Sequence, residues 1–246
     1  MDLNQHYGEK CVRRKLDQLP KEPGLRRRKK IVLGIKAVFF SFLAAGCLGL
    51  CLGAGVYRGI VADTPDVSEI NIGPGKYASF VYDAEGNQIQ QINEAQSNRI
   101  HVSIEDIPED MQHAIVAIED SRFYEHHGID PRGILRAAAV TVTSGFQETE
   151  GASTITQQLI KNNVFTDWTD ENFFQSVRRK IQEQQLAVEL EEYLTEQGLD
   201  AKSVILEEYL NTVNFGSGAY GIQTAARTYF GKDSRDLTLS ECAVLA

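Results

Sequence analysis

The sequence predicts a mainly α-helical domain with a small β hairpin near the membrane, preceded by one transmembrane helix. Three observations carry this prediction: an apolar run from Ile31 to Val56, helical periodicity from Pro108 onward, and a hydrophobic content of 42%, which is enough for a sizeable core. The predicted organisation is a basic tail over 1–30, an anchor over 31–56, a linker and hairpin over 57–105, and a helical core over 106–246.

The chain opens with a basic tail. Residues 1–36 hold 11 Lys and Arg against 4 Asp and Glu, so the remaining residues carry a net charge of −16 while the whole chain carries −9. A basic tail on an acidic body argues against nucleic acid as the main partner, because no basic patch is spread over the globular part. We expect the tail to be disordered.

The apolar run over 31–56 follows the tail directly. It contains one charged residue, Lys36, which lies near the start and can extend its ammonium group to the membrane surface. The run is long enough to cross a bilayer, and the basic flank predicts a cytoplasmic N-terminus with the rest of the chain outside. The alternative is a cleaved signal peptide, but the run is long for one and no clean A-x-A site follows it.

Residues 57–105 predict a linker and a hairpin. Residues 61–76 contain two prolines, two glycines and several acids, which is typical of a linker. Residues 77–82 and 88–92 predict two strands joined by a turn at Glu85-Gly86-Asn87. A further strand is predicted over 99–104.

The remaining chain predicts helices. Met111, Ile115 and Ile118 repeat at helical spacing. Further helices are predicted over 132–144, 154–162, 173–196, 203–211 and 222–229. Thr238 and Glu241 form a capping box that opens a last helix, and the sequence stops inside it. We therefore expect the core to be incomplete at its C-terminal end.

Glu119 and Asp120 end the first of these helices. Acids at a helix C-terminus are unfavourable, because the helix dipole favours cations there. A local rule broken in this way indicates a functional site, although a solvated helix end is an equally good interpretation of these residues alone. Two histidines follow at 126 and 127, but neighbouring side chains point to different faces of most backbones, so we expect no shared metal. The four cysteines show no disulfide or metal spacing.

Two further clusters carry candidate residues. Residues 151–161 place glycine and small hydroxyls before a helix whose free N–H groups could hold an anion, and an ordinary N-cap by Ser153 or Thr154 explains the same pattern. Arg179 and Glu183 lie one helical turn apart, and Glu183 borders an apolar stripe. A carboxylate there is either paired or functional.

Five motifs in order give the chain a resemblance to the family 51 glycosyltransferases, the peptidoglycan polymerase domains of class A penicillin-binding proteins and of monofunctional transglycosylases. The motifs are Glu119 to His126 with Gly128, Gly151 to Asn162, Arg179 to Glu183 with Leu190-Glu191, Lys202 to Asn211, and Gly221 to Lys232. The resemblance implies a lysozyme-like helical fold for the core.

The resemblance also implies a reaction. Members of this family join lipid II units by inverting transfer, with release of undecaprenyl diphosphate. By match to the motifs, Glu119 is implied as general base and Glu183 as the second catalytic carboxylate. Lys161 and Arg179 match the diphosphate-binding positions. The other implied substrate-binding residues are Ser153, Thr154, Gln157, Gln158, Asp120, Phe123 and His126.

Two other functions were weighed against this one. A lysozyme-like glycoside hydrolase would use two carboxylates and water, but it would need no cations for a diphosphate. A non-catalytic membrane-anchored scaffold for cell-wall proteins would need neither the carboxylates nor the cations. No Ser-x-x-Lys, Ser-Asp-Asn or Lys-Thr-Gly motif for a transpeptidase occurs in this sequence.

The resemblance also implies where the protein is located and what it binds. It implies a bacterial cell membrane with a single span and an extracellular or periplasmic catalytic domain. Lipid II, the growing glycan strand and the membrane are the expected partners. A fused transpeptidase domain and cell-wall assembly proteins are further candidates, and nucleic acid is not expected. No cofactor is required, and a divalent cation is left open.

Overall fold

The computed structural model describes residues 8–18, 23–73, 79–92, 98–145, 151–165 and 171–246. The chain forms two compact units, residues 1–57 and 58–246. The described part is mainly helical, which confirms the mainly α-helical part of the predicted fold class.

The first unit contains helix α2 (Glu9–Gln18) and most of helix α3 (Pro23–Ala62). Disorder was predicted over the tail, and for α2 this is wrong. Glu9 in the first turn and Lys15 in the last turn suit the helix dipole. Within the described residues α3 is the one helix long and apolar enough to cross a membrane, and its large apolar side chains are exposed.

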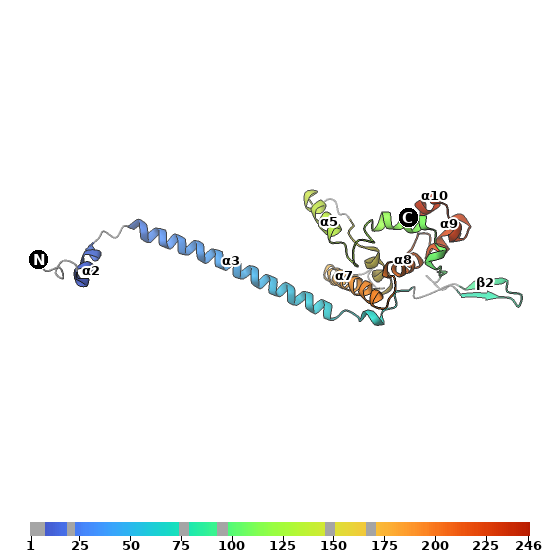
Figure 1. The fold of residues 1–246 in the computed structure, drawn as a ribbon, viewed down its shortest axis with the longest axis horizontal. Coiled ribbons are helices and arrows are strands. Elements are labelled where there is room, and N and C mark those ends of the chain that lie inside the picture. Colours follow the sequence, from blue (N-terminus) through green and yellow to red (C-terminus); the bar gives the residue numbers. More distant parts are fainter. Residues whose placement is uncertain (1–7, 19–22, 74–78, 93–97, 146–150, 166–170) are drawn as a thin grey trace. The chain divides into compact units, whose positions relative to one another are not determined.

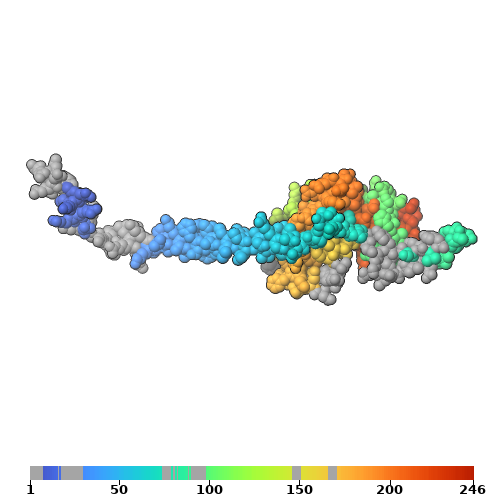
Figure 2. Space-filling model, turned by 90° about the horizontal axis from the view of Figure 1, so that it is seen from below, coloured from blue at the N-terminus to red at the C-terminus, as the bar shows by residue number. Residues whose placement is uncertain are grey.

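The second unit is built from short helices (Figure 1). In chain order they are α4 (Glu109–Glu119), α5 (Pro131–Thr143), α6 (Ile155–Asn163), α7 (Phe173–Glu196), α8 (Ala201–Thr212), α9 (Ile222–Phe230) and α10 (Leu239–Leu245), with 3-10 turns η1 (Val67–Glu69), η2 (Ile104–Asp106) and η4 (Ser234–Asp236). Helix α8 packs against α6, α7 and α9. Turn η1 packs against α7, and Figure 2 shows the teal surface of this part of the chain beside the orange surface.

The unit also contains one antiparallel strand pair, β1 (Ser79–Tyr82) and β2 (Gln88–Ile92), in which Ser79 pairs with Ile92. The Asp83 carboxylate closes the turn between them, because it accepts hydrogen bonds from the backbone N–H of Glu85 and Asn87 at 3.0 and 2.7 Å. Residues 77 and 78, which were predicted to begin the first strand, lie outside the described residues.

The strand predicted over 99–104 does not form. The side chain of Asn211 on α8 takes the place of a neighbouring strand: its Oδ1 accepts from Val102 N–H at 2.9 Å and its Nδ2 donates to Val102 O at 2.8 Å. Ile104 N–H donates to Glu207 at 2.7 Å. The backbone groups of this segment are therefore satisfied by α8 side chains rather than by a sheet.

One apolar core lies between α6, α7 and α8. Burying each large aliphatic side chain contributes about 1.5–3 kcal/mol relative to exposure. The fully or almost fully buried side chains include Met111, Phe123, Ile155, Leu159, Ile160, Leu186, Ala187, Ile205, Leu206, Leu210 and Ile222. Helices α6 and α7 carry the candidate polar residues on other faces, so this core fixes the spacing of those residues.

Gly128 brings the loop after α4 directly onto α7. Its φ is +75°, which L-residues with side chains rarely adopt, and a Cβ atom there would overlap the carbonyl of Ala187. The loop can approach α7 this closely only because residue 128 has no side chain.

We predict that Gly128→Ala destabilises the domain by about 3 kcal/mol or more, because the substitution combines an unfavourable φ with a steric overlap. Gly198→Ala is the matched control: its φ is +76°, but nothing lies within 4 Å of its Cβ position. The control should lose only about 1 kcal/mol. Urea unfolding of both variants measures the difference, and equal losses would contradict the close approach at Gly128.

Candidate active site

Glu119 ends α4, and its carboxylate is partly buried. Gln158 Nε2 on α6 donates to Glu119 Oε2 at 2.8 Å, and the hydroxyl of Tyr209 on α8 donates to Gln158 Oε1 at 3.2 Å. Burial, with a smaller contribution from Glu119, raises the pKa of Tyr209 above its usual range, so its hydroxyl stays protonated and can donate. This chain orients the Glu119 carboxylate.

Asp120 faces the opposite way from Glu119. Both of its carboxylate oxygens lie within 3.0 Å of His126 Nε2, and Oδ2 also accepts from Ile155 N–H at 3.1 Å. The first N–H group of α6, at Ile155, thus offsets part of the negative charge at the end of α4. The two acids at the C-terminal end of α4 are therefore stabilised by this contact and by the hydrogen bond from Gln158.

The structure places Phe123 and His126 in the interior. The Phe123 side chain is fully buried, and the ammonium of Lys202 lies 4.5 Å from the centre of its ring. His126 is also buried, with Nε2 bound to Asp120. These two side chains and Asp120 hold the loop, and each has its main contacts with the protein itself.

Helix α6 begins at a side-chain cap. The Thr154 hydroxyl accepts from Gln157 N–H at 3.2 Å and donates to Gly128 O at 2.6 Å. Thr154 is therefore a cap that also anchors the Gly128 loop. Gln157 is 1% exposed, and neither polar atom of its amide has a hydrogen-bond partner in the part of the chain that the structure describes. Such a group indicates a bound molecule.

A cluster of cations lies between α6 and the start of α7. Glu183 is 1% exposed and is bonded to Arg179 and, at 3.1 Å, to Lys180. Arg179 Nε also donates to both oxygens of Glu171 at 2.9 and 2.8 Å. Burial lowers the pKa of Arg179, but these carboxylates more than offset it and raise the value overall. Arg179 is thus held rigidly and charged.

Lys161 on α6 faces the same cluster. Burial lowers its pKa below the usual value, and Arg179 and Lys180 lower it further, while Glu183 raises it. With all groups ionised, the three cations of this cluster outweigh its two carboxylates by one charge. The cluster is therefore short of negative charge, and an anion would relieve the repulsion among the cations.

Two adjoining pockets join these groups. One, of about 360 Å³, is lined by Glu119 and other residues of the loop and of α5 and α6. The second, also of about 360 Å³, is lined by Ser153, Gln157, Gln158, Lys161, Arg179, Lys180 and Glu183. Ser153 and Gln158 line both pockets. A carboxylate on one side and a cation cluster on the other thus open into adjoining space.

Comparison with known proteins identifies the family of this chain. Residues 85–246 match the family model described as transglycosylase. The chain belongs to the transglycosylase family. It is 44% identical over 214 residues to penicillin-binding protein 1A of Escherichia coli (strain K12), covering 85% of this chain and 23% of that protein. It is 35% identical over 247 residues to penicillin-binding protein 1A/1B of Bacillus subtilis (strain 168), covering 99% of this chain and 25% of that protein. The chain therefore spans about a quarter of the length of these relatives.

The candidate site contains residues to which the sequence analysis gave no role. Lys180 Nζ donates to Ser153 Oγ at 2.6 Å, and its position three residues before Glu183 was a signal that could have found it. Glu171 precedes α7 in a loop, and nothing in the sequence points to it. Arg122 and Asp130 form an ion pair beside Glu119 that lowers the pKa of Asp130.

A buried ion pair joins the helices that carry the candidate site. Lys202 Nζ on α8 lies 2.8 Å from the carboxylate of Glu191 on α7, and it also donates to His126 O at 2.7 Å. The Thr156 hydroxyl on α6 donates to Glu191 at 2.8 Å. Helices α6, α7 and α8 therefore meet at the Glu191 carboxylate, and Lys202 links this carboxylate to the loop after α4.

We predict that Lys202→Met lowers the free energy of unfolding by about 3–5 kcal/mol, because Glu191 would stay buried without its cation. Adding Glu191→Gln to this variant removes the unpaired charge, so the double variant should regain part of the loss. Urea unfolding of the wild-type protein, Lys202→Met, Glu191→Gln and the double variant measures both effects. A double variant whose loss equals the sum of the two single losses would show that the ion pair carries no coupling.

Proposed function

We propose that this chain is a peptidoglycan glycosyltransferase that polymerises lipid II by inverting transfer, with release of undecaprenyl diphosphate. One observation carries the proposal: the Glu119 carboxylate and a cluster of three cations line adjoining pockets that share Ser153 and Gln158. A transfer reaction with a diphosphate leaving group needs a base at one end of its site and fixed positive charge at the other. Membership of the transglycosylase family supports the same reaction.

Glu119 is the proposed general base. The 4-hydroxyl of the acceptor sugar is a poor nucleophile, so a carboxylate must take its proton as the hydroxyl attacks the anomeric carbon of the donor. Gln158 holds one carboxylate oxygen of Glu119 at 2.8 Å, which fixes the direction of the group. The bond from that anomeric carbon to the diphosphate breaks as the new glycosidic bond forms, and the configuration inverts.

Lys161, Arg179 and Lys180 are the proposed diphosphate-binding residues. Negative charge develops on the leaving diphosphate, and cations already in position stabilise it without reorganisation. Glu183 touches two of these cations, so we assign it a positioning role at the diphosphate end of the site. Protein cations supply this charge, so the proposal requires no cofactor, and a divalent cation arriving with the diphosphate is compatible with it.

Ser153 and Gln157 are the proposed polar contacts of the substrate. Ser153 lines both pockets, and Gln157 is buried with both amide atoms lacking partners among the described residues. A sugar hydroxyl or phosphate oxygen would satisfy that amide. Thr154, Asp120, Phe123 and His126 act through the shape of the loop and the cap of α6.

The membrane setting completes the proposal. Helix α3 is long and apolar enough to anchor the chain in the bilayer that carries a lipid-linked substrate. The basic run over 26–30 at the start of α3 favours a cytoplasmic N-terminus, with the catalytic unit outside the bacterial cell membrane. The proposed partners are lipid II, the glycan strand and the membrane, together with a fused transpeptidase domain and cell-wall assembly proteins.

We predict that Glu119→Gln abolishes polymerisation and leaves the fold intact, since glutamine keeps the shape of the side chain but cannot accept the proton. The protein in detergent is given labelled lipid II, and glycan chains are resolved on a gel. Glu196→Gln, an exposed change on α7, is the matched control and should keep wild-type turnover.

Each outcome of this experiment has a meaning. A glycan ladder with wild-type protein and with Glu196→Gln, but not with Glu119→Gln, supports the polymerase and its base. An undiminished ladder with Glu119→Gln would reject Glu119 as the base. Cleavage of preformed glycan without a ladder would indicate a hydrolase, and neither activity from the folded protein would favour the scaffold.

We predict that Lys161→Ala weakens binding of a diphosphate-linked lipid at least about tenfold, while binding of the lipid-free disaccharide changes little, because Lys161 contacts the diphosphate and not the sugar. Titration of both ligands measures the two affinities. Arg178→Ala is the matched control, because Arg178 lies next to Arg179 but pairs with exposed Asp63. Equal losses for both ligands would contradict the role of Lys161.

A further inference from the structure

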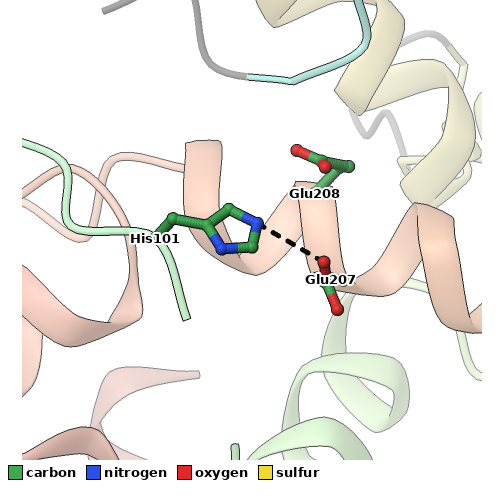
Figure 3. Close-up of side chains that lie close together, drawn as sticks. All are labelled: His101, Glu207 and Glu208. Atoms are coloured by element: carbon green, nitrogen blue, oxygen red, sulfur yellow. Dashed lines mark ion pairs between the residues drawn. The ribbon is translucent and has the colours of Figure 1, made fainter. Parts of the chain in front are cut away.

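A second cluster of titratable groups lies outside the two pockets. His101 precedes η2, and Glu207 and Glu208 are neighbours on α8 (Figure 3). His101 Nε2 lies 3.4 Å from Glu207 Oε1, and one ligand atom from each of the three residues lies within 4.8 Å of the others. None of these residues lines the pockets that contain Glu119 or Lys161. The proposed glycosyltransfer does not use them.

We propose that His101, Glu207 and Glu208 bind a divalent transition-metal ion, for which Zn²⁺ is the best fit. The donor set is one imidazole nitrogen and two carboxylate oxygens, which suits Zn²⁺. Mg²⁺ and Ca²⁺ prefer oxygen ligands throughout, so the imidazole argues against them. The separation of the ligand atoms is within reach of one ion, with small side-chain rotations.

An independent observation at Glu208 points to a bound cation. Its Oε2 atom is buried and has no hydrogen-bond partner among the described residues. Gly73 covers this carboxylate closely, since a Cβ atom there would lie 3.2 Å from Glu208 Oε2. A buried carboxylate oxygen without a partner is costly, and a metal ion would satisfy it.

The other two residues leave the site accessible. The side chains of His101 and Glu207 are 39% and 23% exposed, so an ion can enter and keep water in its remaining positions. Ile104 N–H holds Glu207 Oε2 at 2.7 Å, which leaves Oε1 directed toward His101. A hydrogen bond of this kind orients a metal ligand.

Binding of the ion would link two segments of the domain. The ion would fasten the segment before η2 to α8, beside the two hydrogen bonds from Asn211 to Val102. Helix α8 packs against α6, which carries Gln158 and Lys161. The metal would therefore stabilise the domain without touching the substrate. This inference does not rest on the proposed function.

Calorimetric titration of the whole chain in detergent with ZnCl₂ tests the proposal. We expect one site in the wild-type protein that His101→Gln and Glu208→Gln each weaken at least about tenfold. Zn²⁺ should also raise the melting temperature of the wild-type protein by more than that of either variant. His113→Ala and Glu192→Gln, both exposed changes elsewhere, are the matched controls and should bind as the wild type does.

Two results would overturn the site. One is the absence of saturable Zn²⁺ binding to the wild-type protein. The other is unchanged affinity in His101→Gln and Glu208→Gln, which would assign the ion to other residues. If one of these variants does not fold, Co²⁺ spectra of the wild-type protein still decide. Absorption bands typical of nitrogen and oxygen ligation are expected, and a sulfur-to-metal charge-transfer band would place the metal at a cysteine instead.

Discussion

The carboxylate of Asp120 holds the end of α4 against the start of α6, and the candidate site depends on this contact. The side chain is buried, and its three contacts reach two parts of the chain, His126 in the loop and Ile155 N–H at the head of α6. Because Asp120 is fixed inward, the preceding residue, Glu119, is directed outward toward Gln158. Removing one of these partners would leave a buried charge uncompensated, which costs about 3–5 kcal/mol.

A second buried carboxylate, that of Glu191, also joins parts of the domain that are distant in sequence. Glu191 joins Thr156 of α6 to Lys202 of α8, and Lys202 reaches on to the His126 carbonyl. The two networks meet at His126 and enclose the loop from both sides. Polar groups buried in this way are satisfied only in one arrangement of the helices, so they specify the register of α6 against α7 and α8 as well as stabilise it.

Local sequence signals predicted the helices well, because caps act over three or four residues. The helix predicted over 173–196 has those bounds, and Asn172 and Gln175 form its capping box. Thr154 caps α6 as the simpler interpretation of its motif required. The strand over 99–104 failed because its partner is the Asn211 side chain, which is far away in sequence.

The sequence predicted part of the membership of the candidate site but not the orientation of its side chains. Family motifs pointed to Glu119, Lys161, Arg179 and Glu183, and the structure brings the last three to one pocket. The inward turn of Asp120, Phe123 and His126 follows from the backbone after α4, where φ and ψ of Asp120 are −158° and 73°. No periodic pattern extends past a helix end, so residue spacing cannot say which of these side chains points inward. Glu171 was missed for the same reason.

The cation cluster shows how three cations can be held close together. Arg179 is neutralised by Glu171 and Glu183, so it is fixed at little electrostatic cost. The excess charge falls on the lysines, and burial lowers the pKa of Lys161. Arg179 and Lys180 lower this pKa further, and a bound anion would raise it again, because the anion supplies the opposite charge.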